Sequence, residues 1–207
     1  ILIVGEGRRT EYNYFASFGK AFAERLDAAS TSIKVKHGEG GDALSIVKRA
    51  VREAASFRPD RKRGDHVFLV MDTEGAARAS GLLPAHRLAE QNGIRIIHSS
   101  PSIEYWLLCH FDRVPIRHFE QTKEVITYLN KHWKQVSNQS YNKTDPDIFE
   151  RLESRLEKAY SFALEIDLQR IASGEISAGA NPSSQIYELV AILIGASAGE
   201  KCPVSGV

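Results

Sequence analysis

The feature that most constrains the fold is the alternation of short strand-like runs with helix-like stretches across residues 1–111. Four strand-like runs lie at 1–4, 32–37, 66–71 and 94–97, and apolar residues recur at helical spacing between them. This alternation is typical of βαβ units, whose strands pair in parallel. The apolar run 1–4 suits a strand buried on both faces. The sequence therefore predicts an α/β fold with a parallel sheet of about four strands flanked by helices.

Capping residues indicate where several helices begin. Thr10 is expected to cap a helix that continues to about residue 26, and Asp42 one that runs through Ala55. A helix is expected near 84–92. The stretch 99–102 precedes another at 103–111.

The second half of the chain has a different pattern. Residues 119–134, 146–172 and 184–195 are predicted helices, and Ser183 is expected to cap the last one. Turn-forming residues fill 138–145 and 174–182. We therefore predict an α/β core at 1–112, a helical extension packed on it at 113–195, and a flexible tail at 196–207.

Composition excludes several classes of protein. The formal net charge is +1 and the pI about 8.0, too mild to indicate nucleic-acid binding without local clustering. Two distant cysteines argue against a disulfide framework or a zinc site and favour a reducing, cytoplasmic location. No apolar run approaches the roughly 18 residues of a membrane span.

Because the sequence starts inside a predicted strand, we expect the natural N-terminus to lie further upstream.

Three carboxylates follow two of the predicted strands. Glu6 comes two residues after the first strand, Asp72 directly follows the third, and Glu74 lies two residues later. Ligands of open parallel sheets bind at the carboxyl ends of strands, so adjacent strands would bring these acids together. Clustered carboxylates repel one another, and a hard cation such as Mg²⁺ or Mn²⁺ relieves that repulsion. The alternative is that such acids cap helices or face solvent.

The segments around these acids resemble two motifs of the Toprim domain. Ile-Leu-Ile-Val-Gly-Glu-Gly (1–7) matches the motif glutamate, and Val-Met-Asp-Thr-Glu-Gly (70–75) matches the D-x-D motif, with Glu74 where Toprim domains usually have Asp. Further segments resemble the RloB-like family of Toprim proteins, namely 11–15, the stretch Ser-Ser-Pro-Ser-Ile-Glu-Tyr-Trp-Leu-Leu-Cys-His-Phe (99–111), 141–143 and 181–184.

The resemblance implies a Toprim-like catalytic core at 1–112 and metal-dependent phosphodiester chemistry. It gives Glu6 the role of metal ligand or general acid/base, and Asp72 and Glu74 the role of metal ligands. RloB-like proteins are prokaryotic and occur beside restriction and anti-phage genes, which implies a role in defence.

Other residues are candidates for the same chemistry. Glu104, near the start of a predicted helix, is a possible fourth ligand or orienting group; the dipole of that helix would also favour a carboxylate there. Arg8, Arg9 and Lys143 are candidates for binding substrate phosphate, and Lys143 also for stabilising the transition state. Each of the three could instead be solvated.

A few residues are expected to have structural roles. The basic connection 58–63 is expected to be a solvated loop, although with Lys131, His132 and Lys134 it could contact a nucleic-acid backbone. His110 is expected to be a hydrogen-bonded core histidine. The remaining aromatic candidates are expected in the core, namely Tyr14, Phe15, Phe18 and Trp106.

Two functional hypotheses follow, together with a third in which the acids are merely solvated. The first is a Mg²⁺- or Mn²⁺-dependent nuclease acting on DNA or RNA, with a possible partner defence protein and possible homo-oligomerisation. The second is a non-catalytic protein that binds metal and nucleic acid or a nucleotide while its helical half docks a partner.

Overall fold

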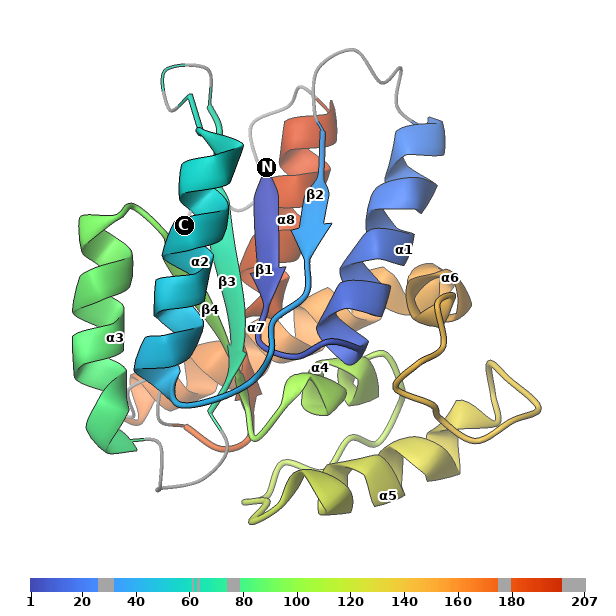
Figure 1. Ribbon diagram of the computed structural model, residues 1–207. Helices are drawn as coiled ribbons and strands as arrows, with labels where there is room; N and C mark the ends of the chain where they lie inside the picture. The colour runs from blue at the N-terminus through green and yellow to red at the C-terminus, as the bar shows by residue number, and fades with distance from the viewer. Residues whose placement is uncertain (26–31, 61, 63, 74–78, 175–179, 199–207) are drawn as a thin grey trace.

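The computed structural model describes residues 1–25, 32–60, 62, 64–73, 79–174 and 180–198. Its centre is a five-stranded sheet in the order β2-β1-β3-β4-β5 (Figure 1). The first four strands are parallel, and β5 pairs antiparallel with β4 at the edge. The predicted parallel α/β sheet is therefore confirmed, with an additional edge strand that the sequence analysis missed.

The first four strands lie close to their expected positions, whereas the fifth was not expected. The strands are β1 (Leu2–Gly5), β2 (Lys34–Lys36), β3 (Val67–Asp72), β4 (Arg95–Ser100) and β5 (Ser183–Ser184). The helices are α1 (Thr10–Arg25), α2 (Ala43–Phe57), α3 (Ala79–Gln91), α4 (Ile103–Cys109), α5 (Thr122–Trp133), α6 (Ile148–Leu152), the 3₁₀ turn η3 (Glu153–Arg155), α7 (Leu156–Ala172) and α8 (Ile186–Ala198).

The two predicted N-caps have different outcomes. Asp42 caps α2 as expected, because its carboxylate accepts a hydrogen bond from the Ser45 amide at 3.0 Å. Thr10 is instead the first residue of α1, and its hydroxyl lies 3.1 Å from the Tyr141 hydroxyl. The Thr10 side chain thus belongs to a long-range contact.

Several boundaries in the second half of the chain differ from the prediction. Ser183 does not cap α8; it pairs with Ser100 in β5, and its hydroxyl donates to the Ala180 carbonyl at 2.8 Å. The predicted single helix 146–172 is divided into α6, η3 and α7. The first three residues of the predicted tail, 196–198, belong to α8, and residues 199–207 lie outside the described part of the chain.

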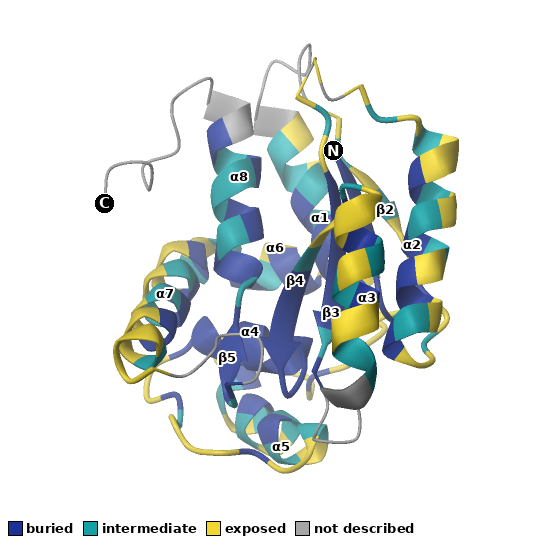
Figure 2. Ribbon diagram, turned by 90° about the vertical axis from the view of Figure 1, so that its left-hand side faces the viewer, coloured by how far each residue is buried: buried dark blue, intermediate teal, exposed yellow. Residues whose placement is uncertain are grey.

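The sheet separates two apolar clusters. On one face, Leu2, Val4 and Leu69 pack with buried residues of α2 and α3. On the other, Ile3 and Phe68 pack with residues of α1 and of every helix from α4 to α8. Figure 2 shows β3 and the second part of β4 as buried and the outer side of α3 as exposed. Alternating residues of each central strand therefore point into different clusters, as a pleated strand requires.

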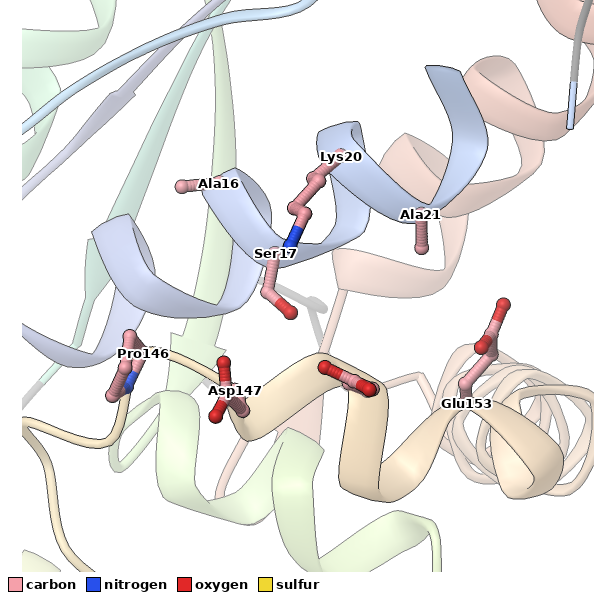
Figure 3. A pocket seen from close by; sticks show the side chains of 8 residues that line it. Ala16, Ser17, Lys20, Ala21, Pro146, Asp147 and Glu153 are labelled. Atoms are coloured by element: carbon pink, nitrogen blue, oxygen red, sulfur yellow. The ribbon is translucent and has the colours of Figure 1, made fainter. Parts of the chain in front are cut away.

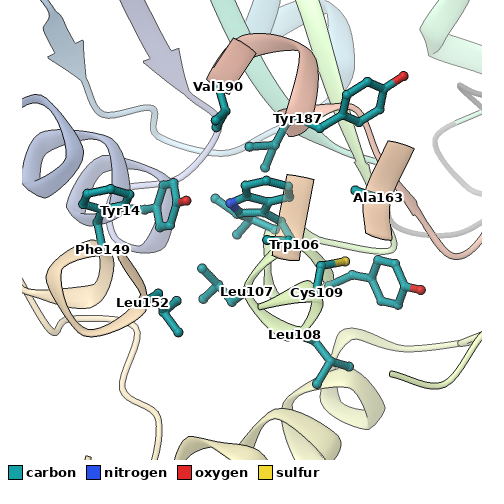
Figure 4. Packing of buried hydrophobic residues seen from close by; sticks show 14 of the residues in the cluster. Tyr14, Trp106, Leu107, Leu108, Cys109, Phe149, Leu152, Ala163, Tyr187 and Val190 are labelled. Atoms are coloured by element: carbon teal, nitrogen blue, oxygen red, sulfur yellow. The ribbon is translucent and has the colours of Figure 1, made fainter. Parts of the chain in front are cut away.

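The larger cluster is rich in aromatic side chains (Figure 4). The predicted core residues Tyr14, Phe15, Phe18 and Trp106 are all fully buried. His110 is also buried: its Nδ1 lies 3.0 Å from the Trp106 carbonyl oxygen and its Nε2 lies 3.4 Å from the Tyr14 hydroxyl. Burial lowers its pKa to about 4, so His110 is a neutral core histidine, as predicted. Within the described residues, no helix combines the length and apolar character needed to cross a membrane.

Candidate functional site

The carboxyl ends of β1 and β3 meet at one edge of the sheet. The two strands are neighbours, with Gly5 opposite Val70. One residue beyond β1, the Glu6 carboxylate accepts a hydrogen bond from the Asp72 amide at 3.0 Å. Glu6 is only 8% exposed. The predicted convergence of Glu6 and Asp72 is therefore confirmed. Glu74 lies outside the described residues.

Asp72 connects the end of β3 to the start of α4. Its Oδ1 accepts a hydrogen bond from the Ile103 amide at 2.8 Å. The first amides of a helix have no partner within the helix, and the α4 cap residue Ser102 makes no side-chain cap. The Asp72 carboxylate, at the end of β3, therefore accepts a hydrogen bond from the first amide of α4. This hydrogen bond holds the start of α4 beside the carboxylates.

Glu104 is held by donors from three separate segments. The Ser102 hydroxyl donates to it at 2.7 Å, the Tyr141 hydroxyl at 3.0 Å and the Thr10 hydroxyl at 3.4 Å. Lys143 completes the set with an ion pair at 3.0 Å. Glu104 is 1% exposed. It therefore fits the orienting role considered from the sequence, because it fixes Lys143 and Tyr141 beside the start of α1.

Glu11 is a fourth acid of the site that the sequence reasoning did not assign. It lies in the first turn of α1, is 5% exposed, and its Oε1 accepts a hydrogen bond from the Gly7 amide at 3.3 Å. A Cβ at Gly5 would approach the Glu11 Cβ to 2.9 Å, so glycine permits this close packing. The available sequence signal was the position of Glu11 one residue after Thr10, directly behind the turn that carries Glu6.

Proximity and burial perturb the protonation of these acids. Burial raises the pKa of Glu11 to about 7, and the negative charges of Glu104 and Glu6 add to the rise. Burial also raises the pKa of Asp72 well above its usual range, reinforced by Glu11, Glu104 and Glu6. Burial by itself lowers the pKa of Lys143, but Glu104 and the other acids raise it above its ordinary value. Burial and the close approach of the acids therefore favour the protonated forms of Glu11 and Asp72.

These side chains surround a cavity of about 230 Å³. Arg8 and Arg9 line it and are exposed, as expected of residues that could meet phosphate. Gly40 forms another part of the wall, and its amide donates to the Glu6 carbonyl at 3.0 Å. The complete lining is Glu6, Gly7, Arg8, Arg9, Thr10, Glu11, Gly40, Asp72, Ile103, Glu104 and Lys143. The cavity thus brings together all the described residues that the sequence predicted to bind metal, bind phosphate or orient the site.

Other candidate features lie elsewhere. The basic connection after α2 is at the opposite end of the molecule from α5, which carries Lys131 and His132 (Figure 1). The two therefore do not form one contiguous surface. The connection is exposed at Arg58 and Lys62, as expected of a solvated loop, and Arg61 and Arg63 lie outside the described residues. A second cavity of about 410 Å³ lies between α1 and α6 (Figure 3). Its acids are Asp147, Glu150 and Glu153, and no predicted site residue lines it.

The donor set can be compared with the needs of a hard cation. Within the described ranges, no three His, Cys, Asp or Glu side chains already form a group able to hold a metal ion. Glu6 and Asp72 are nevertheless oxygen donors at one point of a cavity where burial, together with the neighbouring acids, raises the pKa of Asp72. That chemistry fits Mg²⁺ or Mn²⁺, with Glu6 and Asp72 as the residues that would hold it.

Comparison with protein families identifies the family of this chain. The model of the family described as RloB-like protein matches residues 1–193. Searches of curated proteins and of solved structures returned no match. The family match covers the sheet, the carboxylate cavity and the first part of α8. The chain therefore belongs to the family of RloB-like proteins.

Proposed function

We propose that this protein is a divalent-metal-dependent nuclease of the Toprim type, which hydrolyses phosphodiester bonds of DNA or RNA in prokaryotic anti-phage defence. The observation that carries the proposal is the meeting of Glu6, Asp72 and Glu11 with Lys143 around one cavity at the carboxyl ends of β1 and β3. Membership of the RloB-like family supports the same reading.

Each residue has a definite task in this scheme. A cation bound at Glu6 and Asp72 would polarise the scissile phosphate and lower the pKa of a bound water. Lys143, oriented by Glu104 at 3.0 Å, places a positive charge where the negative charge of the phosphate builds up. Arg8 and Arg9 bind the flanking phosphate oxygens. Glu11, with a pKa near 7, can hold or release a proton at neutral pH.

A second candidate function is binding without cleavage. It is favoured by the hydrogen bonds that Glu6, Asp72 and Glu104 already accept from protein donors. In this case the site binds a cation together with nucleic acid or a nucleotide and presents the complex to a partner.

The two candidates are separated by a cleavage assay. Plasmid DNA and structured RNA are incubated with the wild-type protein, Glu6→Gln and Asp72→Asn, in Mg²⁺ or Mn²⁺ and in EDTA. The nuclease proposal predicts wild-type cleavage that EDTA abolishes and that each substitution reduces by at least about a hundredfold, the scale of losing one catalytic group. Cleavage that survives both substitutions refutes the assigned site. Metal-dependent stabilisation without cleavage supports the binding function.

A further inference from the structure

The carboxylate cavity is poor in cations that are available to a polyanion. It contains four acids, Glu6, Glu11, Asp72 and Glu104, against the three cations Arg8, Arg9 and Lys143, and Lys143 is already paired with Glu104. A nucleic acid gains most of its affinity from protein cations that replace its counterions. A strand that reaches the cavity therefore needs favourable electrostatic contacts from a surface outside it, in addition to Arg8 and Arg9.

The segment 113–134 is the region of surplus positive charge. It carries five Lys or Arg residues against two Glu residues, a net +3, whereas the whole chain carries +1. Three of these cations, Lys123, Lys131 and Lys134, lie on or directly after α5, and all three are exposed. Within the described part of the chain none of them forms an ion pair, because the acid of α5, Glu124, is held by Arg117 at 2.7 Å.

Helical geometry aligns these lysines. Lys123, Thr127 and Lys131 follow one another at intervals of four residues, so they share one face of α5 with Lys134 close to the same line. At 1.5 Å per residue the row is about 16 Å long. A strand of B-DNA advances about 3.4 Å along the axis per nucleotide, so the row can lie beside several consecutive phosphates.

The α5 helix is coupled directly to the cavity. The Asn130 side chain accepts a hydrogen bond from the Tyr141 amide at 2.9 Å, and the Tyr141 hydroxyl donates to Glu104. Two residues further on, Lys143 reaches Glu104. Figure 1 shows α5 beside α4 at the end of the molecule where β1 and β3 terminate.

The other basic surfaces are less suitable. On α2, Arg49 pairs with Glu39 at 2.7 Å and lies 3.9 Å from Glu53. The connection after α2, with Arg58 and Lys62, lies at the far end of the molecule (Figure 1). We propose that the exposed lysine row of α5, Lys123, Lys131 and Lys134, is the surface on which the sugar-phosphate backbone of a nucleic acid lies as the strand passes to the carboxylate cavity. This inference rests on the nucleic-acid substrate of the proposed function, and it is independent of cleavage.

The test measures binding while cleavage is blocked. A fluorescently labelled 30-base-pair DNA and a labelled single-stranded RNA are titrated in EDTA, and the association constant is followed by anisotropy from 50 to 300 mM salt. The test variant is Lys123→Gln/Lys131→Gln. The matched control, Arg58→Gln/Lys62→Gln, removes two exposed charges at the far end of the molecule. Circular dichroism verifies that both variants are folded.

The row predicts weaker binding by the test variant and a shallower salt dependence. The slope of log K against log salt should decrease by about 1.8 on duplex DNA or about 1.4 on single strands, since each phosphate contact contributes about 0.9 or 0.7. The control should retain the wild-type slope. An unchanged slope in the test variant, an equal decrease in the control, or no binding by the wild type overturns the inference. Failure of the nuclease proposal gives a different result: the wild type binds nucleic acid with the expected salt dependence but does not cleave it in Mn²⁺.

Discussion

The hydroxyl of Tyr141 provides a sharp test of the geometry of the site. It is buried, donates to the Glu104 carboxylate at 3.0 Å and lies 3.1 Å from the Thr10 hydroxyl, while its ring packs edge-to-face on Trp133. Tyr141→Phe removes the hydroxyl and retains the ring. A hydrogen bond to a charged group contributes about 1.5–3 kcal/mol, so we expect unfolding to become easier by about 2 kcal/mol. In a chain of 207 residues this lowers Tm by about 4–8 °C.

Urea denaturation followed by circular dichroism measures this loss, and a double-mutant cycle assigns it to the pair. Glu104→Gln and the double variant should give a coupling free energy of about 1 kcal/mol or more with Tyr141→Phe. The control is Tyr12→Phe, because Tyr12 is 36% exposed and a surface substitution changes stability by less than about 0.5 kcal/mol. A Tyr141→Phe loss no larger than that of the control, or a coupling near zero, refutes the proposed network around Glu104.

Three further predictions concern the acids, the core and the cation. Because the folded-state pKa of Glu11 is about 7 against an ordinary 4.5, its protonated form favours folding below pH 4.5 and this advantage is lost as the pH rises through 7. In EDTA, the free energy of unfolding of Glu11→Gln should therefore rise by about 3 kcal/mol relative to that of the wild type between pH 4.5 and 8, at 1.36 kcal/mol per pKa unit. A difference between the two proteins that does not change with pH contradicts this. Phe149→Ala should lower the free energy of unfolding, measured by urea denaturation, by about 3–5 kcal/mol because Phe149 is fully buried. Leu168→Ala should lower it by less than about 0.5 kcal/mol because Leu168 is 56% exposed. Equal losses contradict the described core. Mn²⁺ at a hundred times its Kd should stabilise the wild type by about 2.7 kcal/mol in a thermal melt. The same concentration should leave the stability of Glu6→Gln/Asp72→Asn unchanged. Equal stabilisation of both proteins would mean that the cation binds elsewhere.

The parallel sheet was predictable because its strands have strong local signals. Ile1 to Val4 and Val67 to Met71 are continuous apolar runs, and each ends at an acid within two residues. The positions of the acids at the strand ends predicted the meeting of Glu6 and Asp72 on the condition that the two strands are neighbours. The strand order of the sheet, with β1 beside β3, meets that condition.

The missed features depend on contacts between distant segments. β5 is two serines long, and it is a strand only because it pairs with Ser99 and Ser100 of β4. Short polar segments of this kind have no period that a sequence reading can detect. The break near Glu153 that separates α6 from α7 is likewise not marked by Pro or Gly.

The site shows the same division between local and long-range signals. Lys143 was identified from a motif, but the hydrogen bonds of Tyr141 and Thr10 to Glu104 join residues 37 and 94 positions apart. Glu11 lies in the segment 11–15 that resembles the RloB-like family, but it received no role, because one acid in the first turn of a helix is explained by the helix dipole alone. Its burial, which raises its pKa, and its proximity to Glu104 and Glu6, which adds to the rise, become visible only in three dimensions.

The central claim is that Glu6 and Asp72 share one divalent cation at the ends of β1 and β3. An anomalous difference map from a crystal grown with Mn²⁺ tests it most directly. The account predicts a single strong peak within about 2.0–2.3 Å of a carboxylate oxygen of each residue, a spacing typical of small divalent cations. A map with no peak in this cavity, or with Mn²⁺ bound only at another cluster of acids, contradicts the metal-dependent mechanism.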